Sequence, residues 1–322
     1  MKDVASRAGV ALKTVSRVVN GEPGVTPATA SRVQGAIEDL GFRRNESARL
    51  LRTGQTATLG FIAEDSADPD QAALYRGLEE VAAERGFLVY SGSTGRDPAR
   101  EERLALALCA RRVDGMVIVP AAGDHGYLVT EIKAGVAAVF ALRPPGGTAL
   151  GDRVVIDERG GAKAAVAHLA EHGHRRIGFV GGDFGTYRSR RLVLGYTEAM
   201  AAARLPVDEA WRALTPGDLA SANVTAVLCG SRAHTARALR VLAATRAAGR
   251  APRKAVIGFG DLELADLVQP GITVVSYDPV RIGRAAGELL VRRLAGDDSP
   301  PRLVELPTRL IPRGSAEFPP DD

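Results

Sequence analysis

The stretch GVALKTVSRVVNG, Gly9 to Gly21, decides the fold of the N-terminal part of this chain. It opens on a glycine, closes on Asn-Gly, and is basic and rich in serine and threonine. The preceding DVASRAG predicts a short helix that ends at Gly9 and whose apolar face consists of Val4, Ala5 and Ala8. LKTVSRVVN predicts a second short helix, in which the inward-facing residues are Val15, Val18 and Val19. Two short helices joined by a glycine-containing turn, here filled by Val10, form a helix-turn-helix motif.

A third helix is expected to complete a small core. Thr26 is a suitable N-cap, because its hydroxyl can accept a backbone N–H of the first turn. Pro27 follows at the first helical position, where a missing N–H costs nothing. Apolar residues then recur at helical spacing before Gly41, and they are Val33, Ile37 and Leu40.

The positive charge of the chain is concentrated in this N-terminal unit. Residues 1–56 contain nine basic and five acidic residues, whereas the rest of the chain contains 33 of each. A basic head on a neutral body is typical of proteins that bind nucleic acid. A solvated basic face would give the same count, so charge alone leaves both readings open.

The composition excludes several other classes. A chain of 322 residues with 45% apolar and 25% charged residues is typical of a soluble protein with two or three domains. Cys109 and Cys229 lie far apart and form no CxxC pair, which argues against a zinc ribbon or a disulfide framework. No apolar run approaches the roughly 20 residues that span a bilayer. The N-terminal residues lack the apolar core of a secretory signal, so we expect a cytoplasmic protein.

The N-terminal residues resemble a known family. DVASRAGVALKTVSRVVNG, followed at fixed spacing by LGFRRN and ARLLRTG, is similar to the head and hinge of the lactose-repressor (LacI/GalR) family of transcriptional regulators. The resemblance extends through nearly the whole chain, to PTRLIPRGS near its end. It implies an α/β protein: a three-helix helix-turn-helix head, a hinge helix, and a periplasmic-binding-protein-like core of two doubly wound parallel-sheet subdomains.

By this resemblance, residues 12–20 form the recognition helix, whose first turn meets base edges in the major groove. The positions that match the base readers of the family are Leu12, Lys13 and Arg17. Lys13 or Arg17 could donate to guanine, whereas Leu12 can make only apolar contact, for instance with a thymine methyl group. The expected phosphate contacts, which position the helix without specifying sequence, are Thr14, Ser16 and Asn20. Ala11 stands where the family usually has a serine N-cap, so we expect a weaker cap and somewhat weaker DNA contact.

NESARLLRTGQ, from Asn45 to Gln55, matches the hinge helix of the family. The resemblance implies that it forms on the operator, pairs with the same helix of a second copy, and inserts a leucine into the minor groove. Leu51 matches that leucine, and Ala48 beside it would permit close approach. An isolated helix this short is marginal in water, and the alternative is that Leu50 and Leu51 pack on the core.

From Thr58 onward, strand-like and helical segments alternate, which predicts parallel sheets covered by helices. The strand-like segments are TLGFIA, FLVYSG, GMVIVP, VAAVFA, DRVVID, RIGFVGG, VTAVLCG, KAVIGFG and TVVSYD. The helices are expected near residues 71–85, 99–111, 126–134, 160–172, 190–203, 232–248 and 279–295. Crossings between subdomains are expected near Asp157 and Asp278. The predicted organisation is therefore a head (1–44), a hinge (45–57) and a core (58–322), whose N-subdomain holds 58–157 and 279–297 and whose C-subdomain holds 158–278 and 298–318.

A ligand cleft is expected between the subdomains, at the carboxyl ends of their strands. The sequence departs there from the family pattern at several positions whose side chains usually hold a sugar. Asp70 and Gln71 stand where the family has aromatic residues, and Gly230-Ser231 stands where it has Asn-Asp. Leu142-Arg143 stands in place of Asp-Arg, Gly260 in place of Asp, and Leu192 in place of the arginine that clamps the effector. The candidate effector contacts are Asp65, Asp70, Arg143, Tyr187, Arg188, Arg191, Ser231 and Asp261. Each of them could instead be a surface or ion-paired side chain. The effector could thus be something other than an ordinary sugar, could be held by other residues, or could be absent.

No signal for catalysis or for a metal emerges. His168 and His172 have metal-ligand spacing on one helix, but His174 lies beyond Gly173 and no further ligand completes a set. The glycine-rich segments match neither GxGxxG nor a Walker loop, and GxSxG, SxxK and HExxH are absent. We therefore expect a non-enzymatic, homodimeric regulator, most simply a repressor, that binds a pseudo-palindromic operator and responds to a small-molecule effector, without cofactor or metal. The alternatives are an architectural or effector-independent DNA-binding protein whose core only dimerises, and a solute-binding protein or sugar-processing enzyme with the same core.

The hinge resemblance makes a testable prediction. Leu51→Ala is expected to weaken specific binding and to reduce DNA bending, because an apolar wedge unstacks a base step and kinks the duplex. A gel-shift titration and a circular-permutation bending assay measure the two effects. Equal affinity and an equal bend in the variant would exclude the wedge role.

Overall fold

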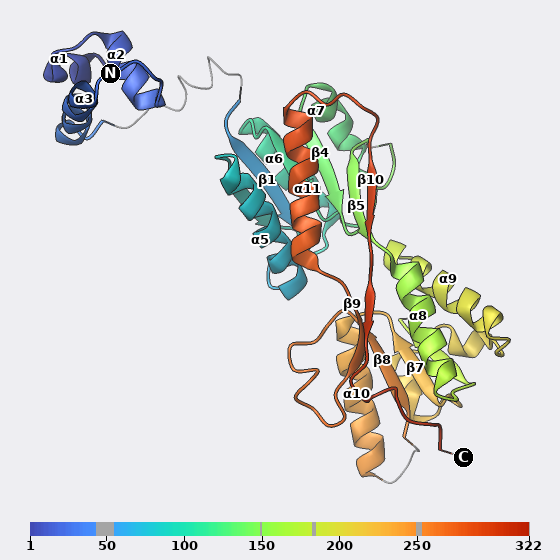
Figure 1. Ribbon diagram of the computed structural model, residues 1–322. Helices are drawn as coiled ribbons and strands as arrows, with labels where there is room; N and C mark the ends of the chain where they lie inside the picture. Colours follow the sequence, from blue (N-terminus) through green and yellow to red (C-terminus); the bar gives the residue numbers. More distant parts are fainter. Residues whose placement is uncertain (43–54, 149, 182–184, 249–252, 322) are drawn as a thin grey trace. The chain divides into compact units, whose positions relative to one another are not determined.

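The computed structural model describes residues 1–42, 55–148, 150–181, 185–248 and 253–321 (Figure 1). The chain divides into two compact units, Met1–Thr56 and Ala57–Asp322. The predicted hinge residues Asn45, Ala48 and Leu51 lie outside the described residues. None of the helices in the described ranges is long and apolar enough to cross a membrane.

The N-terminal unit contains the three expected helices, α1 (Lys2–Ala8), α2 (Leu12–Asn20) and α3 (Pro27–Asp39). Val15 and Val33 are completely buried in its core, where Val10 also packs. A glycine with positive φ follows each of these helices: Gly9 and Gly21 are the caps of α1 and α2, and Gly41 follows the α3 cap. In each case the next residue donates its N–H back to a carbonyl one turn earlier, which is the Schellman arrangement.

One core prediction is wrong in this unit. Leu40 was expected inside, but its side chain is 46% exposed. The reason is that α3 ends at Asp39 and Leu40 occupies the helix cap. The chain then reverses at Gly41, Phe42 donates its N–H to the Ile37 carbonyl at 2.9 Å, and Phe42 packs against the core instead.

The larger unit contains two sheets, A and B. The part built on sheet A is here called the first subdomain, and all strands of sheet A run parallel. Its strand order is β10-β5-β4-β3-β1-β2, formed by β1 (Thr58–Ala63), β2 (Leu88–Ser93), β3 (Gly115–Ile118), β4 (Ala137–Ala141), β5 (Asp152–Ile156) and β10 (Leu303–Leu306). Its helices are α5 (Pro69–Glu84), α6 (Pro98–Ala110), α7 (Val129–Lys133), which a 3-10 turn η1 (Gly126–Leu128) precedes, and α11 (Pro279–Leu294). Alternate residues of the strands face two separate apolar clusters, as expected of a sheet with helices on both faces.

The second subdomain is built on sheet B, whose order is β11-β9-β8-β7-β6. Its strands are β6 (Ile177–Val180), β7 (Ala226–Cys229), β8 (Ala255–Phe259), β9 (Thr273–Ser276) and β11 (Arg309–Ile311). Its helices are α8 (Glu158–Glu171), α9 (Tyr187–Ala202) and α10 (Arg232–Ala247), with 3-10 turns η2 (Glu209–Trp211) and η3 (Pro216–Ala220). The α/β class and the two-subdomain core are confirmed, although sheet B is mixed because its edge strand β11 runs antiparallel to β9.

The prediction for the C-terminal part of the second subdomain needs a correction. Residues 298–318 were expected in the second subdomain, but Leu303–Leu306 pairs with Arg153–Ile156 in sheet A. The last crossing between subdomains therefore lies between Leu306 and Arg309. These two short edge strands, β10 and β11, escaped the sequence prediction because each is partly exposed and neither carries a continuous buried apolar run.

Helices α5 and α11 lie side by side on sheet A (Figure 1), and two glycines set how closely they approach. A Cβ atom at Gly77 would lie 2.1 Å from the Val280 carbonyl oxygen, and one at Gly283 would lie 1.9 Å from that of Leu74. No side chain fits at either place without separating the helices.

We therefore predict that Gly283→Ala lowers the free energy of unfolding of the core by about 1–3 kcal/mol, as expected for overpacking a dense interface. Gly217→Ala is the control, because its new methyl group would meet its nearest neighbour, Thr215 Oγ1, at an ordinary 3.6 Å. Urea denaturation of the two variants tests this, and equal stabilities would show that the helix contact is not tight.

Candidate DNA-reading helix and interdomain cleft

Helix α2 presents its first turn outward. Leu12 is 47% exposed and Lys13 is also exposed. Val15, which follows Thr14 on the next part of the turn, is completely buried. The buried valine fixes the rotation of the helix about its axis, so the first turn cannot bury Leu12. A large apolar side chain held at the exposed start of a helix is suited to contact a partner.

The rest of α2 is less accessible. Thr14, Ser16 and Arg17 are half-buried. Arg17 extends toward the turn after the helix, where a Cβ atom at Gly24 would lie 3.7 Å from its Nη1 atom. The α2 cap is Ala11, with extended backbone and no side-chain cap hydrogen bond. The side chain of Asn20 is outside the description, and the DNA roles of all these residues stay predictions.

Across the larger unit, Arg232 joins the two subdomains. It is the first residue of α10 in the second subdomain, and its guanidinium reaches Asp68 and Asp70 at the start of α5 in the first. Nη2 lies 2.9 Å from Asp68 Oδ1, and Nη1 lies 3.1 Å from Asp70 Oδ1. The Tyr277 hydroxyl also donates to Asp70 Oδ2 at 2.6 Å. We call Arg232 with Asp68 and Asp70 the Arg232 bridge.

The bridge depends on the missing side chain of Gly260. A Cβ atom built at this position would lie 2.9 Å from Arg232 Cγ, so Arg232 occupies the space that a side chain at residue 260 would take. Gly260 also has φ of +84°, which side-chain-bearing residues rarely adopt. The family usually has an aspartate where this chain has Gly260. The space that the aspartate side chain would take is occupied here by an arginine from the neighbouring helix.

Burial changes the chemistry of two carboxyl groups, Asp70 at the bridge and Glu158 beside Arg188. Burial raises the pKa of Asp70 above its usual range, although the Tyr277 hydrogen bond and the Arg232 charge oppose the shift. Glu158, the first residue of α8, is completely buried, and burial raises its pKa to about 7 against the opposing charge of Arg188. Neither oxygen of Glu158 has a hydrogen-bond partner among the described residues. Arg188 Nε is the nearest cation, at 3.9 Å from Oε1.

Arg188 connects these groups. Its guanidinium lies over the rings of Phe259 and Tyr277, at 5.9 and 5.8 Å from their centroids. Both distances are within the range of a cation–π contact. Arg188 thus lies between the aromatic side chains at the ends of β8 and β9 and the buried Glu158.

The other predicted effector contacts pair with groups of the protein itself, and one of these pairs, between Arg191 of α9 and Glu305 of β10, also joins the two subdomains. Asp65 is exposed and accepts the Ala67 N–H at 2.9 Å. Arg143 pairs with Glu64 at 3.0 Å, and Arg191 pairs with Glu305 at 2.7 Å. Asp261 forms a two-pronged pair with Arg313, at 2.7 and 2.8 Å between N and O atoms.

Of the remaining two, Ser231 caps α10 by accepting the His234 N–H at 3.2 Å. Tyr187 begins α9, and burial raises the pKa of its hydroxyl. The structure thus brings Asp70 and Arg188 together around Tyr277, and their roles toward an effector stay predictions. Sequence reasoning missed Arg232, Glu158, Asp68 and Tyr277. The one signal in the sequence that could have pointed to Arg232 was Gly260, because a missing side chain leaves space for another.

The three histidines noted in the sequence have separate partners. His168 Nε2 lies 2.6 Å from Glu317 Oε1, and His174 contacts the Phe318 carbonyl and Thr225. His172 bonds to the His168 carbonyl. In the described ranges, no group of three or more His, Cys, Asp or Glu residues is arranged to hold a metal ion.

Two domain families match the chain. Residues 1–45 match the bacterial regulatory proteins of the lacI family, and residues 166–316 match the periplasmic binding protein-like domain. The first range covers the helix-turn-helix unit, and the second covers most of the second subdomain together with α11 and β10 of the first.

Full-length relatives agree with this assignment. The HTH-type transcriptional regulator CelR of Thermobifida fusca is 34% identical over 97% of this chain and 96% of its own length. The regulator GalR of Salmonella typhimurium is 31% identical over 100% and 97%. Both relatives are named as transcriptional regulators.

Solved structures show the same fold. A CelR–cellobiose complex superposes with a TM-score of 0.71 at 31% identity, covering 98% of both chains. The lac repressor dimer bound to operator and the anti-inducer ONPF gives 0.80 at 22% identity, again covering 98% of both. With the helix-turn-helix unit, the two-subdomain core and these full-length relatives, this chain belongs to the LacI/GalR family of DNA-binding transcriptional regulators.

Proposed function

We propose that this regulator is a homodimeric repressor that binds a pseudo-palindromic operator, with its two heads in successive major grooves. The observation that carries the proposal is the outward first turn of α2, where Leu12 and Lys13 are exposed above the buried Val15. A helix held in this way can place its N-terminal residues against base edges. The basic excess of the head supplies the phosphate attraction that such binding needs.

Leu12, Lys13 and Arg17 are assigned to base reading, and Thr14, Ser16 and Asn20 to phosphate contacts. Asn45, Ala48 and Leu51 are assigned to the minor groove at the centre of the operator. In this organisation residues 1–44 bind DNA, 45–57 connect, and 58–322 dimerise and respond to effector. A bacterial cytoplasmic location follows from the need to reach DNA.

The effector is assigned to the space between the subdomains, beside Asp70, Arg188 and Glu158. CelR is solved with cellobiose, but this chain lacks the family's sugar-holding residues at Gly230, Gly260 and Leu192. Leu192 is completely buried in the core and cannot act as a clamp. We infer that the effector is not an ordinary sugar, and that it shifts the angle between subdomains by weakening or strengthening the Arg232 bridge. A coupling of about 1–3 kcal/mol would suffice.

A second candidate function is DNA binding that needs no effector. The Arg232 bridge favours it, because side chains of this chain itself join the two subdomains. In that case the core only dimerises. A screen of metabolites for release from the selected operator separates the two functions, since an architectural protein would respond to none.

Selection of bound DNA from a random library tests the proposed function directly. The full-length chain is expected to enrich a palindrome whose half-sites lie about one helical turn apart. Salt-sensitive binding without an enriched motif would contradict a sequence-specific repressor and would favour the architectural alternative.

Lys13→Ala is expected to relax base preference at one position in each half-site, because a lysine can donate to guanine in the major groove. Arg32→Ala on the exposed surface of α3 is the matched control, since it removes the same charge elsewhere in the head. Both variants should weaken binding, but only Lys13→Ala should change the selected motif. An unchanged motif would remove Lys13 from the base-reading set.

Glu158 predicts a pH dependence of core stability. Its folded pKa of about 7 exceeds the ordinary value of 4.5, so the folded state binds this proton more tightly than the unfolded state. The contribution of this group to the free energy of unfolding is therefore fully present below pH 4.5 and is lost as the pH rises to about 7. Glu158→Gln should stabilise the core relative to wild type by on the order of 2 kcal/mol more at about pH 8 than at about pH 5. Urea denaturation at both pH values measures it, and parallel curves would contradict it.

A further inference from the structure

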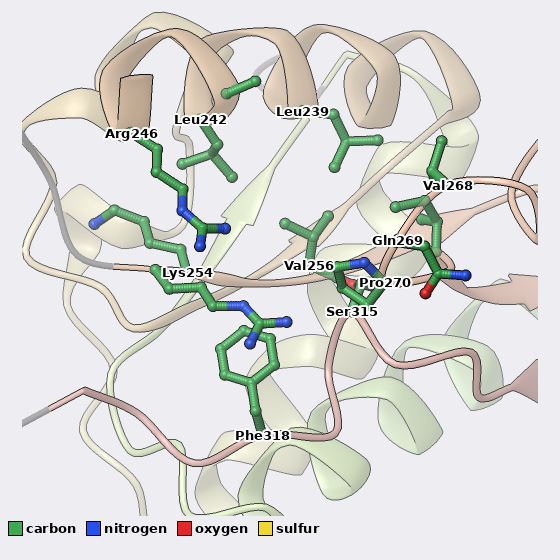
Figure 2. A pocket seen from close by; sticks show the side chains of 13 residues that line it. Leu239, Leu242, Arg246, Lys254, Val256, Val268, Gln269, Pro270, Ser315 and Phe318 are labelled. Carbon is green, nitrogen blue, oxygen red and sulfur yellow. The ribbon is translucent and has the colours of Figure 1, made fainter. Parts of the chain in front are cut away.

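A cavity lies within the second subdomain, and none of the residues of the Arg232 bridge lines it. It has a volume of about 310 Å³ and lies between α10 and the C-terminal segment (Figure 2). Its walls are mainly apolar side chains, contributed by Leu239, Leu242, Val256, Ile272 and Phe318. This volume is at the lower end of the range for small-molecule sites.

The described residues that line the same cavity include the cations Arg246, Arg253 and Lys254. Figure 2 labels Arg246 and Lys254. Lys254 is engaged elsewhere, because its Nζ donates to the carbonyls of Ala222 and Val224 at 2.7 and 2.8 Å. The Arg253 guanidinium lies 3.6 Å above the centroid of the Phe318 ring. It therefore places a charge at the boundary between the apolar wall and solvent.

The two arginines carry uncompensated charge within the part of the chain that the structure describes. No described carboxylate lies within ion-pair distance of the guanidinium of Arg246 or Arg253, and none of the described residues that line the cavity is acidic. Asp321 is the nearby acid, but it accepts the backbone N–H of Arg253 at 3.0 Å. Gln269 adds an exposed amide at the cavity.

We propose that this cavity binds a small amphipathic anion, a carboxylate carried on an apolar body. The apolar walls would bury the body, and Arg246 and Arg253 would pair with the carboxylate, which guanidinium groups match in shape and charge. A cation would be repelled by the arginines, and a neutral apolar molecule would leave them unused. The partial negative charge at the α10 C-terminus opposes an anion there, so both arginines are needed.

This site is independent of the proposed effector cleft and of DNA binding. Helix α10 nevertheless connects them, because Arg232 begins the helix and the cavity lies along its second half, from Leu239 to Arg246. An anion bound there would pack against the helix that carries the Arg232 bridge.

Octanoate and 1-octanol are the probes, since they share an apolar chain and differ in charge. Isothermal titration calorimetry of the full-length protein should show octanoate binding at least about tenfold more tightly than 1-octanol, the difference expected from one charge-assisted hydrogen bond. Arg246→Gln with Arg253→Gln should weaken octanoate binding by a similar factor. Arg237→Gln with Arg240→Gln is the matched control, because both lie exposed on α10 outside the cavity.

The single variant Arg246→Gln keeps the test valid if loss of the Arg253–Phe318 contact impairs folding, because Arg246 is exposed. It too should weaken octanoate binding. Equal binding of octanoate and 1-octanol, unchanged binding in both Arg246 variants, or an absence of octanoate binding would each overturn the proposal. None of these results would affect the operator selection, so failure of this site is distinguishable from failure of the proposed function.

Discussion

The core of this regulator depends on one arginine that takes the place of a missing side chain. Arg232 lies where a side chain at residue 260 would otherwise be, and from there it spans the two subdomains to Asp68 and Asp70. Each of its two ion pairs is partly shielded from solvent, with the Arg232 side chain only 20% exposed. Shielding weakens the competition from water and salt that makes surface pairs nearly neutral in energy.

The cleft therefore combines two kinds of polar chemistry. At the bridge, opposite charges and the Tyr277 hydroxyl satisfy one another. Farther in, Glu158 is buried with neither oxygen hydrogen-bonded by the described residues. A buried polar group without a partner is costly, and such groups in native proteins mark strain, function or bound water. Arg188, lying over Phe259 and Tyr277, connects the two regions and is placed to respond when either changes.

The fold was largely predictable because helical and strand periodicities are local properties of the sequence. The α2 bounds and the buried Val15 followed from spacing alone. The position of Leu40 did not follow from spacing, because the chain reverses at Gly41 and Phe42 packs against the core in its place. The cleft was less predictable, since Arg232, Glu158 and Tyr277 are distant in sequence and meet only after the subdomains are assembled. The departures from the family pattern identified what is absent from the cleft, but they gave no indication of which side chain fills the space.

The most direct test of this account is the distance between the subdomains when the bridge is removed. Spin labels at Glu102→Cys and Arg240→Cys, in a Cys109→Ser background, report that distance by pulsed electron paramagnetic resonance. We predict a narrow distribution in the otherwise wild-type protein and a broader or shifted one in Arg232→Ala. Arg284→Ala is the control, because Arg284 pairs with Glu80 and Glu84 inside the first subdomain. It should leave the distribution unchanged. Identical distributions in both arginine variants would contradict the claim that Arg232 holds the subdomains together.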